Sequence, residues 1–458
     1  MLFRSTLVPG SGNPVNGMHA NGLTGKSDYV DFPFLVLAPR FGFAWNVFGD
    51  NKTVIRGSFG VFYNRPNGNY LVIGSAPPLL YTPTVYYSSV NQIPQAAASA
   101  AISPTNASAQ YGEQKQERNH QFNLTIQRDI GFSTVVDIAY VGNFDRHAQT
   151  STQLNPVPQG AYANPANIFN NTELNPNFLR TNYPGMGSIL YYPGALSALN
   201  YHALQTSAQH RLQRGLQFGV SYVFSKALGT CGAWSGLGQG SGCTIGDPYH
   251  KARDWYYGPI SWDRTHVLNI NYSYQVPVPS QNRVVKAIAN NWVISGITSF
   301  QTGAPATPSC SSVNAGPVNS DPSLSGVGVW ATNNVIGARC QQVGDPKNFT
   351  KSFYQNFNTS AFTLAAPGTF GNIGLGILRQ PSWYNFDLTL QKRIHFSKSE
   401  RRVLQLRFEA YNLLNHAEFT TMGTTMQLSG TANTNTTYGQ FTATNPGRVL
   451  STTARIEF

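Results

Sequence analysis

The chain has 458 residues and a formal net charge of +12, yet only 11% of its residues are charged, less than half of the usual share of about 25%. A mean hydropathy of -0.24, and the lack of any apolar run of about 18 residues, exclude helical membrane spans. The basic residues do not cluster, which argues against a nucleic-acid-binding surface. Because Gly (43), Tyr (23) and Phe (27) are abundant, the composition favours many strands and many turns.

Five pairs of segments alternate apolar and polar residues on either side of a turn. In the third pair, for example, Leu216, Phe218 and Val220 share one face, while Gln217 and Ser221 share the other. A period of two residues predicts strands, and a turn between two such runs predicts a β-hairpin. The hairpins, written as strand, turn and strand, are 39–48, 49–52 and 53–63; 121–127, 129–132 and 134–140; 203–212, 213–215 and 216–224; 266–276, a longer Pro-containing connection and 291–300; and 383–396, 397–400 and 402–411.

An eleventh strand is predicted at the C-terminus, in residues 448–458. One face carries Leu450, Ala454, Ile456 and Phe458, and the other carries Ser451, Thr453, Arg455 and Glu457. This division is typical of a strand between lipid and a polar interior, although a half-buried strand of a soluble protein alternates in the same way. The ending resembles the terminal strand by which bacterial outer-membrane barrels are recognised for assembly, so Phe458 is a candidate assembly signal.

Long connections separate the hairpins and alternate with the short turns. They cover approximately 64–115, 145–200, 227–262, 302–381 and 413–446. Structureless loops of this length are uncommon in compact soluble domains, whereas outer-membrane barrels join their strands by short periplasmic turns and longer extracellular loops. Counting strands places the C-terminus on the short-turn side, as such a barrel requires. The pattern therefore predicts an all-β, antiparallel, up-and-down outer-membrane β-barrel fold with about 11 strands.

The four cysteines are not arranged as Cys-x-x-Cys, which makes a zinc site improbable. Sequence order favours disulfides between Cys231 and Cys243 and between Cys310 and Cys340, in an oxidising compartment. Four cysteines permit three pairings, and free thiols are the remaining alternative.

No catalytic, cofactor or metal site is expected. Asp263 and His266 lie close in sequence, but on an alternating strand they point to opposite faces, which favours a structural role in anchoring a loop. His416 and Glu418 lack an evident third ligand. The glycine-rich run 371–376 lacks the strand, Lys and helix of a phosphate-binding loop, and we interpret it as a flexible loop.

The interior polar residues of a barrel tune what passes or hold a plug, so they are the more plausible functional set. Simple solvation of a wet interior is the alternative. The candidates for this lumen-facing set are Arg40, Arg56, Gln205, Gln209, Arg211, Gln405, Arg407 and Glu409. The aromatic residues Trp45, Tyr140, Tyr272, Tyr274 and Trp383 are candidates for girdles at the membrane interfaces, or for ordinary packing.

Four stretches in this order, together with the terminal Phe458, resemble a TonB-dependent receptor. They are 38–63, which contains Ala38-Pro39-Arg40-Phe41-Gly42-Phe43-Ala44; Ser221 to Lys226; Asp263 to Asn269; and Leu406 to His416. The chain is similar to the C-terminal half of the barrel in the Oar-like group, whose complete chains begin with a carboxypeptidase-regulatory-like domain and a plug. The resemblance implies a barrel of 22 strands with a plugged lumen, of which 11 strands are half.

The resemblance also implies that the parent protein imports a bulky nutrient across the outer membrane of a Gram-negative bacterium. The implied partners are the lipid bilayer, the barrel assembly machinery, an unidentified nutrient ligand, and an inner-membrane energy-coupling protein that acts through the missing N-terminal region. Alternatives are a passive outer-membrane channel or structural surface barrel, and a secreted β-sandwich adhesin that binds glycans through the long loops. Neither an enzyme nor a nucleic-acid-binding protein is expected.

We expect residues 1–458 to form a partial barrel domain, with residues 1–38 as the remnant of an extracellular loop. The first ten residues lack the apolar core of a secretory signal, so the signal peptide and the plug are expected to be absent. The first and eleventh strands run in the same direction. We therefore predict a curved open half-barrel, or closure through a parallel pair.

Overall fold

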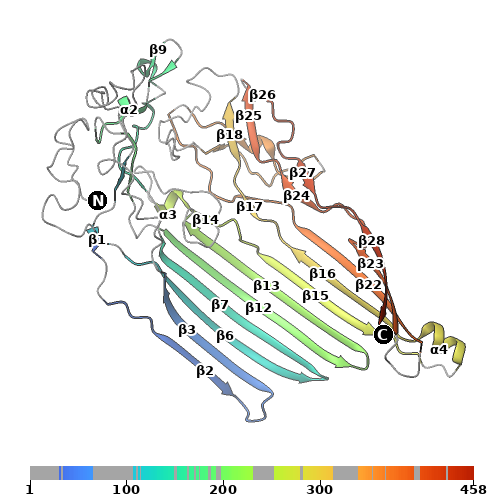
Figure 1. The fold of residues 1–458 in the computed structure, drawn as a ribbon. Coiled ribbons are helices and arrows are strands. Elements are labelled where there is room, and N and C mark those ends of the chain that lie inside the picture. The colour runs from blue at the N-terminus through green and yellow to red at the C-terminus, as the bar shows by residue number, and fades with distance from the viewer. Residues whose placement is uncertain are drawn as a thin grey trace, which may run out of the picture.

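A computed structural model shows one broad sheet with a layer of loops at one end (Figure 1). The structure describes residues 30–31, 35–64, 107–109, 112–113, 115–148, 152–161, 164–169, 172–174, 176–183, 187–191, 197–230, 252–278, 282–312, 339–352, 354–366, 368–396, 403–429 and 432–457. No helix in these residues is long and apolar enough to cross a bilayer.

Eleven strands form the main sheet in sequence order, and each is antiparallel to the one before it. They are β2 (Arg40–Asn46), β3 (Thr53–Tyr63), β6 (Arg118–Gly131), β7 (Thr134–Ala148), β12 (Ser197–Gln213), β13 (Leu216–Thr230), β15 (His266–Gln275), β16 (Trp292–Gln301), β22 (Trp383–His395), β23 (Val403–Tyr411) and β28 (Val449–Glu457). A short strand, β14 (Tyr257–Pro259), also pairs with β13. The prediction of an all-β up-and-down fold with eleven long strands is confirmed.

Two of the described hairpin turns are tight, and one of these lies elsewhere than predicted, whereas the connection between β2 and β3 covers 47–52 instead of 49–52. β6 extends to Gly131, so the turn to β7 is Phe132-Ser133 rather than 129–132; both residues have positive φ, 53° and 58°. Arg214 and Gly215 also have positive φ, 50° and 83°. Positive φ at both central positions is characteristic of the type I′ turn, whose twist matches that of the flanking strands. The turn 397–400 lies outside the described residues.

The β15–β16 connection differs from the expected loop, because it contains the helix α4 (Arg283–Ala289). In Figure 1, α4 and the end of β28 lie together at the end of the sheet that carries the short turns. The loop layer lies at the opposite end. This arrangement confirms the strand polarity inferred from the alternation of short and long connections.

One face of the main sheet is polar. Directly paired residues of an antiparallel sheet share a face, so a row across the strands can be followed through the register. One such row joins Arg56, Thr125, Ala139, Gln205 and Val223. Amides, hydroxyls and charged groups predominate on this side, which we call the polar face.

The other face, one residue along each strand, is apolar. A row on it joins Ile55, Ile126, Ile138, Thr206 and Tyr222. Several large apolar residues of this face are solvent-exposed, so no other part of the described chain covers them. They include Phe41, Phe43, Leu124, Ile126, Ile138, Leu204 and Phe224. A soluble sandwich would bury such a face between two sheets, and the main sheet does not do this.

The sequence predicts structureless long connections, and this prediction is wrong for their described parts. Their described parts contain β1 (Val30–Asp31), β4 (Ala107–Ala109), β5 (Gly112–Glu113), β8 (Thr152–Gln153), η4 (Pro165–Asn167), β9 (Ile168–Phe169), β10 (Thr172–Glu173), α2 (Pro176–Leu179), β11 (Ile189–Tyr191), α3 (Ala252–Trp255), β17 (Pro305–Ala306), β18 (Ser309–Ser312), β19 (Gln341–Gln342), η5 (Thr359–Ala361), β20 (Phe362–Thr363), β21 (Leu378–Arg379), β24 (Phe419–Met422), β25 (Thr425–Ser429), β26 (Ala432–Asn433) and β27 (Phe441–Thr444). These short elements build the loop layer.

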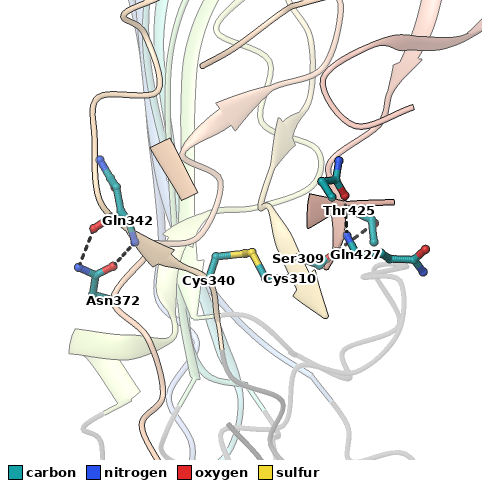
Figure 2. The surroundings of a disulfide bond; sticks show 8 residues. Ser309, Cys310, Cys340, Gln342, Asn372, Thr425 and Gln427 are labelled. Atoms are coloured by element: carbon teal, nitrogen blue, oxygen red, sulfur yellow. Dashed lines mark hydrogen bonds between the residues drawn. A yellow bond between two sulfur atoms is a disulfide. The ribbon is translucent and has the colours of Figure 1, made fainter. Parts of the chain in front are cut away.

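The loop layer has its own hydrophobic core. Phe357, Ile373, Met422, Met426 and Tyr438 are buried together in it. A disulfide between Cys310 and Cys340 joins β18 to the start of β19 beside this core, as sequence order favoured (Figure 2). Cys231 and Cys243 lie outside the described residues. Apolar burial, rather than loop sequence alone, therefore shapes this end of the molecule.

Candidate functional site

The polar face collects nearly all of the predicted lumen-facing residues. Seven of the eight lie on it: Arg40, Arg56, Gln205, Gln209, Gln405, Arg407 and Glu409. The eighth, Arg211, lies in the register shift between His210 and Gln213, beside the turn. It therefore belongs to the rim of the sheet. Within the face, Arg407 and Glu409 form an ion pair with 2.7 Å between Nη2 and Oε1.

A first hollow of about 410 Å³ opens on the polar face over strands β2 to β12. The guanidinium of Arg40 lies 4.8 Å from the centre of the Phe62 ring, a cation–π contact that leaves the rest of the guanidinium for other partners. The side-chain amide of Asn123 donates to Ser58 Oγ at 2.8 Å. The polar side chains that line this hollow are Arg40, Ser58, Gln121, Asn123, Asn143 and Tyr201.

A second hollow of about 390 Å³ lies over β13 to β23. Its one acidic side chain, Asp387, accepts hydrogen bonds from the backbone N–H of Asn412 and from the amide of Asn385, both at 2.9 Å. The remaining lining is mostly uncharged: Gln217, Asn271, Ser273, Ser295, Ile297 and Thr389, with Tyr272, Gly296 and Tyr411. Both hollows thus combine neutral hydrogen-bonding groups with one charged side chain, Arg40 in the first and Asp387 in the second.

Carboxyl groups gather where the polar face meets the loop layer. Asp145 near the end of β7 is only 3% exposed, and its side chain forms a hydrogen bond with Glu117 just before β6. The side-chain amide of Asn64 donates to Glu117 Oε2 at 3.3 Å. Burial raises the pKa of Glu117 above its ordinary value, although both hydrogen bonds oppose the shift.

Asp263 and His266 do not form a catalytic pair. The fully buried Asp263 carboxylate accepts from the backbone N–H of Ala227 at 2.6 Å and pairs with Arg379 at 2.5 Å. His266 Nδ1 instead contacts the hydroxyl of Tyr222 at 2.8 Å. Asp263 therefore ties β13, the start of β15 and β21 together, in agreement with the predicted loop-anchoring role.

The remaining motifs also have structural roles. His416 Nε2 lies 3.9 Å from Glu418 Oε1, and Glu418 Oε2 accepts from Asn445 at 3.0 Å. Within the described ranges, no group of three or more His, Cys, Asp or Glu side chains is placed to hold a metal ion. The run 371–376 is not a free loop: Asn372 hydrogen-bonds with the backbone of Gln342 (Figure 2), and Ile373 is buried in the loop core.

Comparison with known proteins identifies the family. A family model described as "Outer membrane beta barrel domain" matches residues 5–451. The chain belongs to the outer membrane beta barrel domain family. No curated protein matches the chain.

The solved structures to which the chain is similar belong to longer proteins. The outer membrane transporter YddB from Escherichia coli is 12% identical, with a TM-score of 0.44 over 90% of this chain and 39% of that chain. The FrpB iron transporter from Neisseria meningitidis (F3-3 variant) is 10% identical, with a TM-score of 0.38 over 90% of this chain and 38% of that chain. FpvA from P. aeruginosa, in a pyoverdine-bound structure, is 8% identical, with a TM-score of 0.40 over 92% of this chain and 32% of that chain. The chain thus spans about two fifths or less of their lengths.

As a member of the outer membrane beta barrel domain family, the chain resides in the bacterial outer membrane. Its exposed apolar face is the surface that contacts lipid. On this face, the rings of Phe43, Phe122 and Tyr272 occupy the space that a Cβ would need at Gly57, Gly142 and Gly296, their direct cross-strand partners. Aromatic cover of a strand glycine restores the packing that the missing side chain would provide.

The aromatic-girdle prediction is wrong for one residue of this outer membrane barrel. Trp45, Tyr140, Tyr272 and Tyr274 lie on the lipid-facing side. Trp383 pairs with Gln301, in the same row as Gln205, and so lies on the polar face near the loop layer. The alternation within β22 was correct, but its phase relative to the other strands required the register.

Sequence reasoning missed most residues that line the two hollows. Gln121, Asn143 and Tyr201 come from three successive strands and meet only when the strands are paired. Each residue taken alone is an ordinary polar position of an alternating strand. The missing signal was the register of each hairpin, which the two-residue turns at Phe132-Ser133 and Arg214-Gly215 could have supplied.

Proposed function

We propose that the chain forms part of the barrel of a TonB-dependent receptor, and that the whole protein imports a bulky polar nutrient. One observation carries the proposal: a single up-and-down sheet separates a lipid-facing apolar side from a polar side with two hollows. Amide and hydroxyl groups contribute to the lining of both hollows, together with one charged side chain in each, Arg40 in the first and Asp387 in the second. Such groups hydrogen-bond to a large polar ligand, or to a plug domain that moves.

The proposed partners follow from this role. Lipid contacts the apolar face, and an inner-membrane energy-coupling protein supplies the work for import. We further propose that the barrel assembly machinery recognises the C-terminal strand through Phe458, which lies outside the described residues. The lumen-facing role of Arg40, Arg56 and the other residues of the polar face belongs to the same proposal.

A growth assay tests import. A strain that lacks the complete gene is grown with single limiting carbon, iron or vitamin sources, and is complemented with the wild type or with Gln121→Leu plus Asn143→Leu. We expect the wild type to restore growth on one source and the double variant to restore much less. Gln127→Leu, on the same strand and face but outside the hollow, is the matched control. Equal rescue by all three genes would remove the first hollow from the transport path.

A passive channel or structural surface barrel remains the second candidate, because a polar face also suits an open pore. Deleting the energy-coupling protein distinguishes the two: uptake should stop if the receptor proposal is correct and continue through a passive channel. Conductance in planar bilayers gives a second readout, since only a channel conducts steadily without energy. The adhesin alternative is disfavoured, because its sandwich would require a second large sheet against the apolar face.

A further inference from the structure

The helix α4 presents an exposed apolar stripe at the turn end of the sheet. Val284, Val285 and Ile288 are 65%, 41% and 68% exposed. Positions i, i+1 and i+4 lie on one side of a helix, so these side chains form a single stripe. The helix is well defined at its start, where Asn282 Oδ1 accepts from the backbone N–H of Val284 at 2.9 Å and of Val285 at 3.4 Å.

Two contacts fix the other end of α4 to the lipid-facing side of the sheet. The backbone oxygen of Ile288 accepts hydrogen bonds from Trp292 Nε1 and from Lys392 Nζ, both at 2.8 Å. Lys392 also donates to the oxygen of Asn290. Its ammonium lies 5.3 Å from the centre of the Trp292 ring. A cation at this position satisfies the last carbonyls and complements the helix dipole.

Trp292 and Lys392 are direct partners in the β16–β22 ladder. The next residues on the same face, Ile294 and Leu390, are partners as well. Both belong to the apolar face, so the last turn of α4 is held on the side of the sheet that contacts lipid. The exposed stripe of α4 therefore continues the lipid-facing surface rather than the polar one.

We propose that α4 is an interfacial anchor that lies in the phospholipid leaflet on the periplasmic side of the outer membrane. Val284, Val285 and Ile288 enter the boundary between headgroups and acyl chains, where an amphipathic helix gains from burying its apolar side. The only charged residues in its sequence are Arg283 and Lys286, and both are basic. This charge favours anionic headgroups. The inference rests on membership of the barrel family and not on the proposed transport.

Spin-label accessibility tests the anchor. Nitroxide labels are placed at Val284→Cys or Ile288→Cys in the full chain, reconstituted in vesicles of phosphatidylethanolamine and phosphatidylglycerol, with Cys231 and Cys243 replaced by Ser. Gln275→Cys is the matched control, because Gln275 ends β15 at the same level but lies on the polar face and is exposed. We expect the Val284 and Ile288 labels to collide with oxygen several-fold more than with a water-soluble nickel complex. The Gln275 label should show the reverse.

Two results would overturn the proposal. Nickel accessibility at Ile288 equal to that at Gln275 would place the stripe in water, and low accessibility to both reagents would show that a protein or a second copy covers it.

Heat-modifiable gel migration checks that each labelled variant has folded. In the Ile288-labelled chain, Lys392→Met should release the last turn and sharpen the label's spectrum. Exchanging phosphatidylglycerol for neutral lipid should reduce the depth of the label unless Arg283 and Lys286 are also replaced by Gln.

Discussion

Individual residues of this chain hold the loop layer against the sheet. The Asp263 carboxylate is fully buried, whereas the Arg379 side chain that pairs with it is 37% exposed. A buried carboxylate that loses its paired cation is strongly destabilising, because the remaining hydrogen bond from Ala227 does not replace all of the lost hydration. The anchor is therefore asymmetric: removing the arginine leaves a buried charge, while removing both charges leaves only a polar gap.

Arg379→Met should lower the free energy of unfolding by about 3 kcal/mol. Arg379→Met combined with Asp263→Asn should recover much of this loss, because the buried charge is then gone. Urea unfolding of the protein in vesicles measures both. Arg455→Met is the control, since the Arg455–Glu457 pair is exposed and contributes at most about 1 kcal/mol. Additive effects of the two substitutions at 263 and 379 would contradict this account.

The raised pKa of Glu117 predicts that the stability of the start of the loop layer depends on pH. Burial raises its pKa, so the folded state favours the protonated carboxyl. This contribution to stability is complete below the ordinary value of 4.5 and is lost as the pH rises through the folded pKa. Asn64, whose backbone N–H donates to the oxygen of Glu117 at 3.1 Å, should therefore be better protected from hydrogen exchange in acid. After correction for intrinsic rates, Glu117→Gln should reduce the pH dependence, and an unchanged profile would refute the assignment.

At the scale of elements, alternation was sufficient to predict the eleven strands, because each strand has lipid on one side and polar groups on the other. The same reasoning could not find α4, whose seven residues complete fewer than two periods of a helix. It also missed the loop core, where Phe357, Ile373 and Met422 come from distant segments with no common period. Register, and with it the two hollows, depends on pairings that a single strand does not encode.

The pairing of Phe122 with Gly142 gives a prediction for the β6–β7 ladder. The Phe122 ring occupies the position of a Cβ on Gly142, so Gly142→Ala forces the ring away. We expect a loss of about 1–3 kcal/mol, as for other overpacked sites. Phe122→Leu should lower the free energy of unfolding less in the Gly142→Ala background than in the wild type, because the smaller leucine leaves room for the new methyl group. A double-mutant cycle by urea unfolding measures this coupling. Gly49→Ala cannot serve as the control, because Gly49 has a φ of +74° and a side chain there would be strained by the backbone conformation alone.

For the molecule as a whole, the loop layer has a hydrophobic core and a disulfide of its own. The Cys310–Cys340 bond closes a segment with a sequence separation of 30 and borders the loop core. The chain-entropy model gives about 3–4 kcal/mol for a loop of this size. Cys310→Ser plus Cys340→Ser should therefore make the loop layer sensitive to protease while the strands stay protected. Mass spectrometry of the fragments separates these outcomes, and cleavage within β15 or β16 would show that the two layers unfold together.

The sheet as a whole has two edges to satisfy. Within the described residues, β2 pairs only with β3 and β28 only with β23, so the backbone groups on their outer sides have no strand partner. Hydrocarbon cannot replace these hydrogen bonds, and a membrane sheet persists only when its edges are paired. Figure 1 shows the sheet turning towards β28 without reaching β2. The open form of the predicted half-barrel, rather than closure through a parallel pair, is the one observed.

An open sheet predicts that the 458-residue chain, refolded alone in detergent, pairs its edges with those of other copies. Sedimentation should show dimers or larger assemblies whose proportion increases with protein concentration. Pro substitutions at Ala44 in β2 and Thr452 in β28 remove backbone N–H groups that point to the unpaired sides of these strands. They should shift the population towards monomers, whereas Leu388→Pro in the central β22 should prevent folding. A monodisperse wild-type monomer with heat-modifiable migration would instead show that β2 and β28 close on each other, and would favour the passive channel over the receptor fragment.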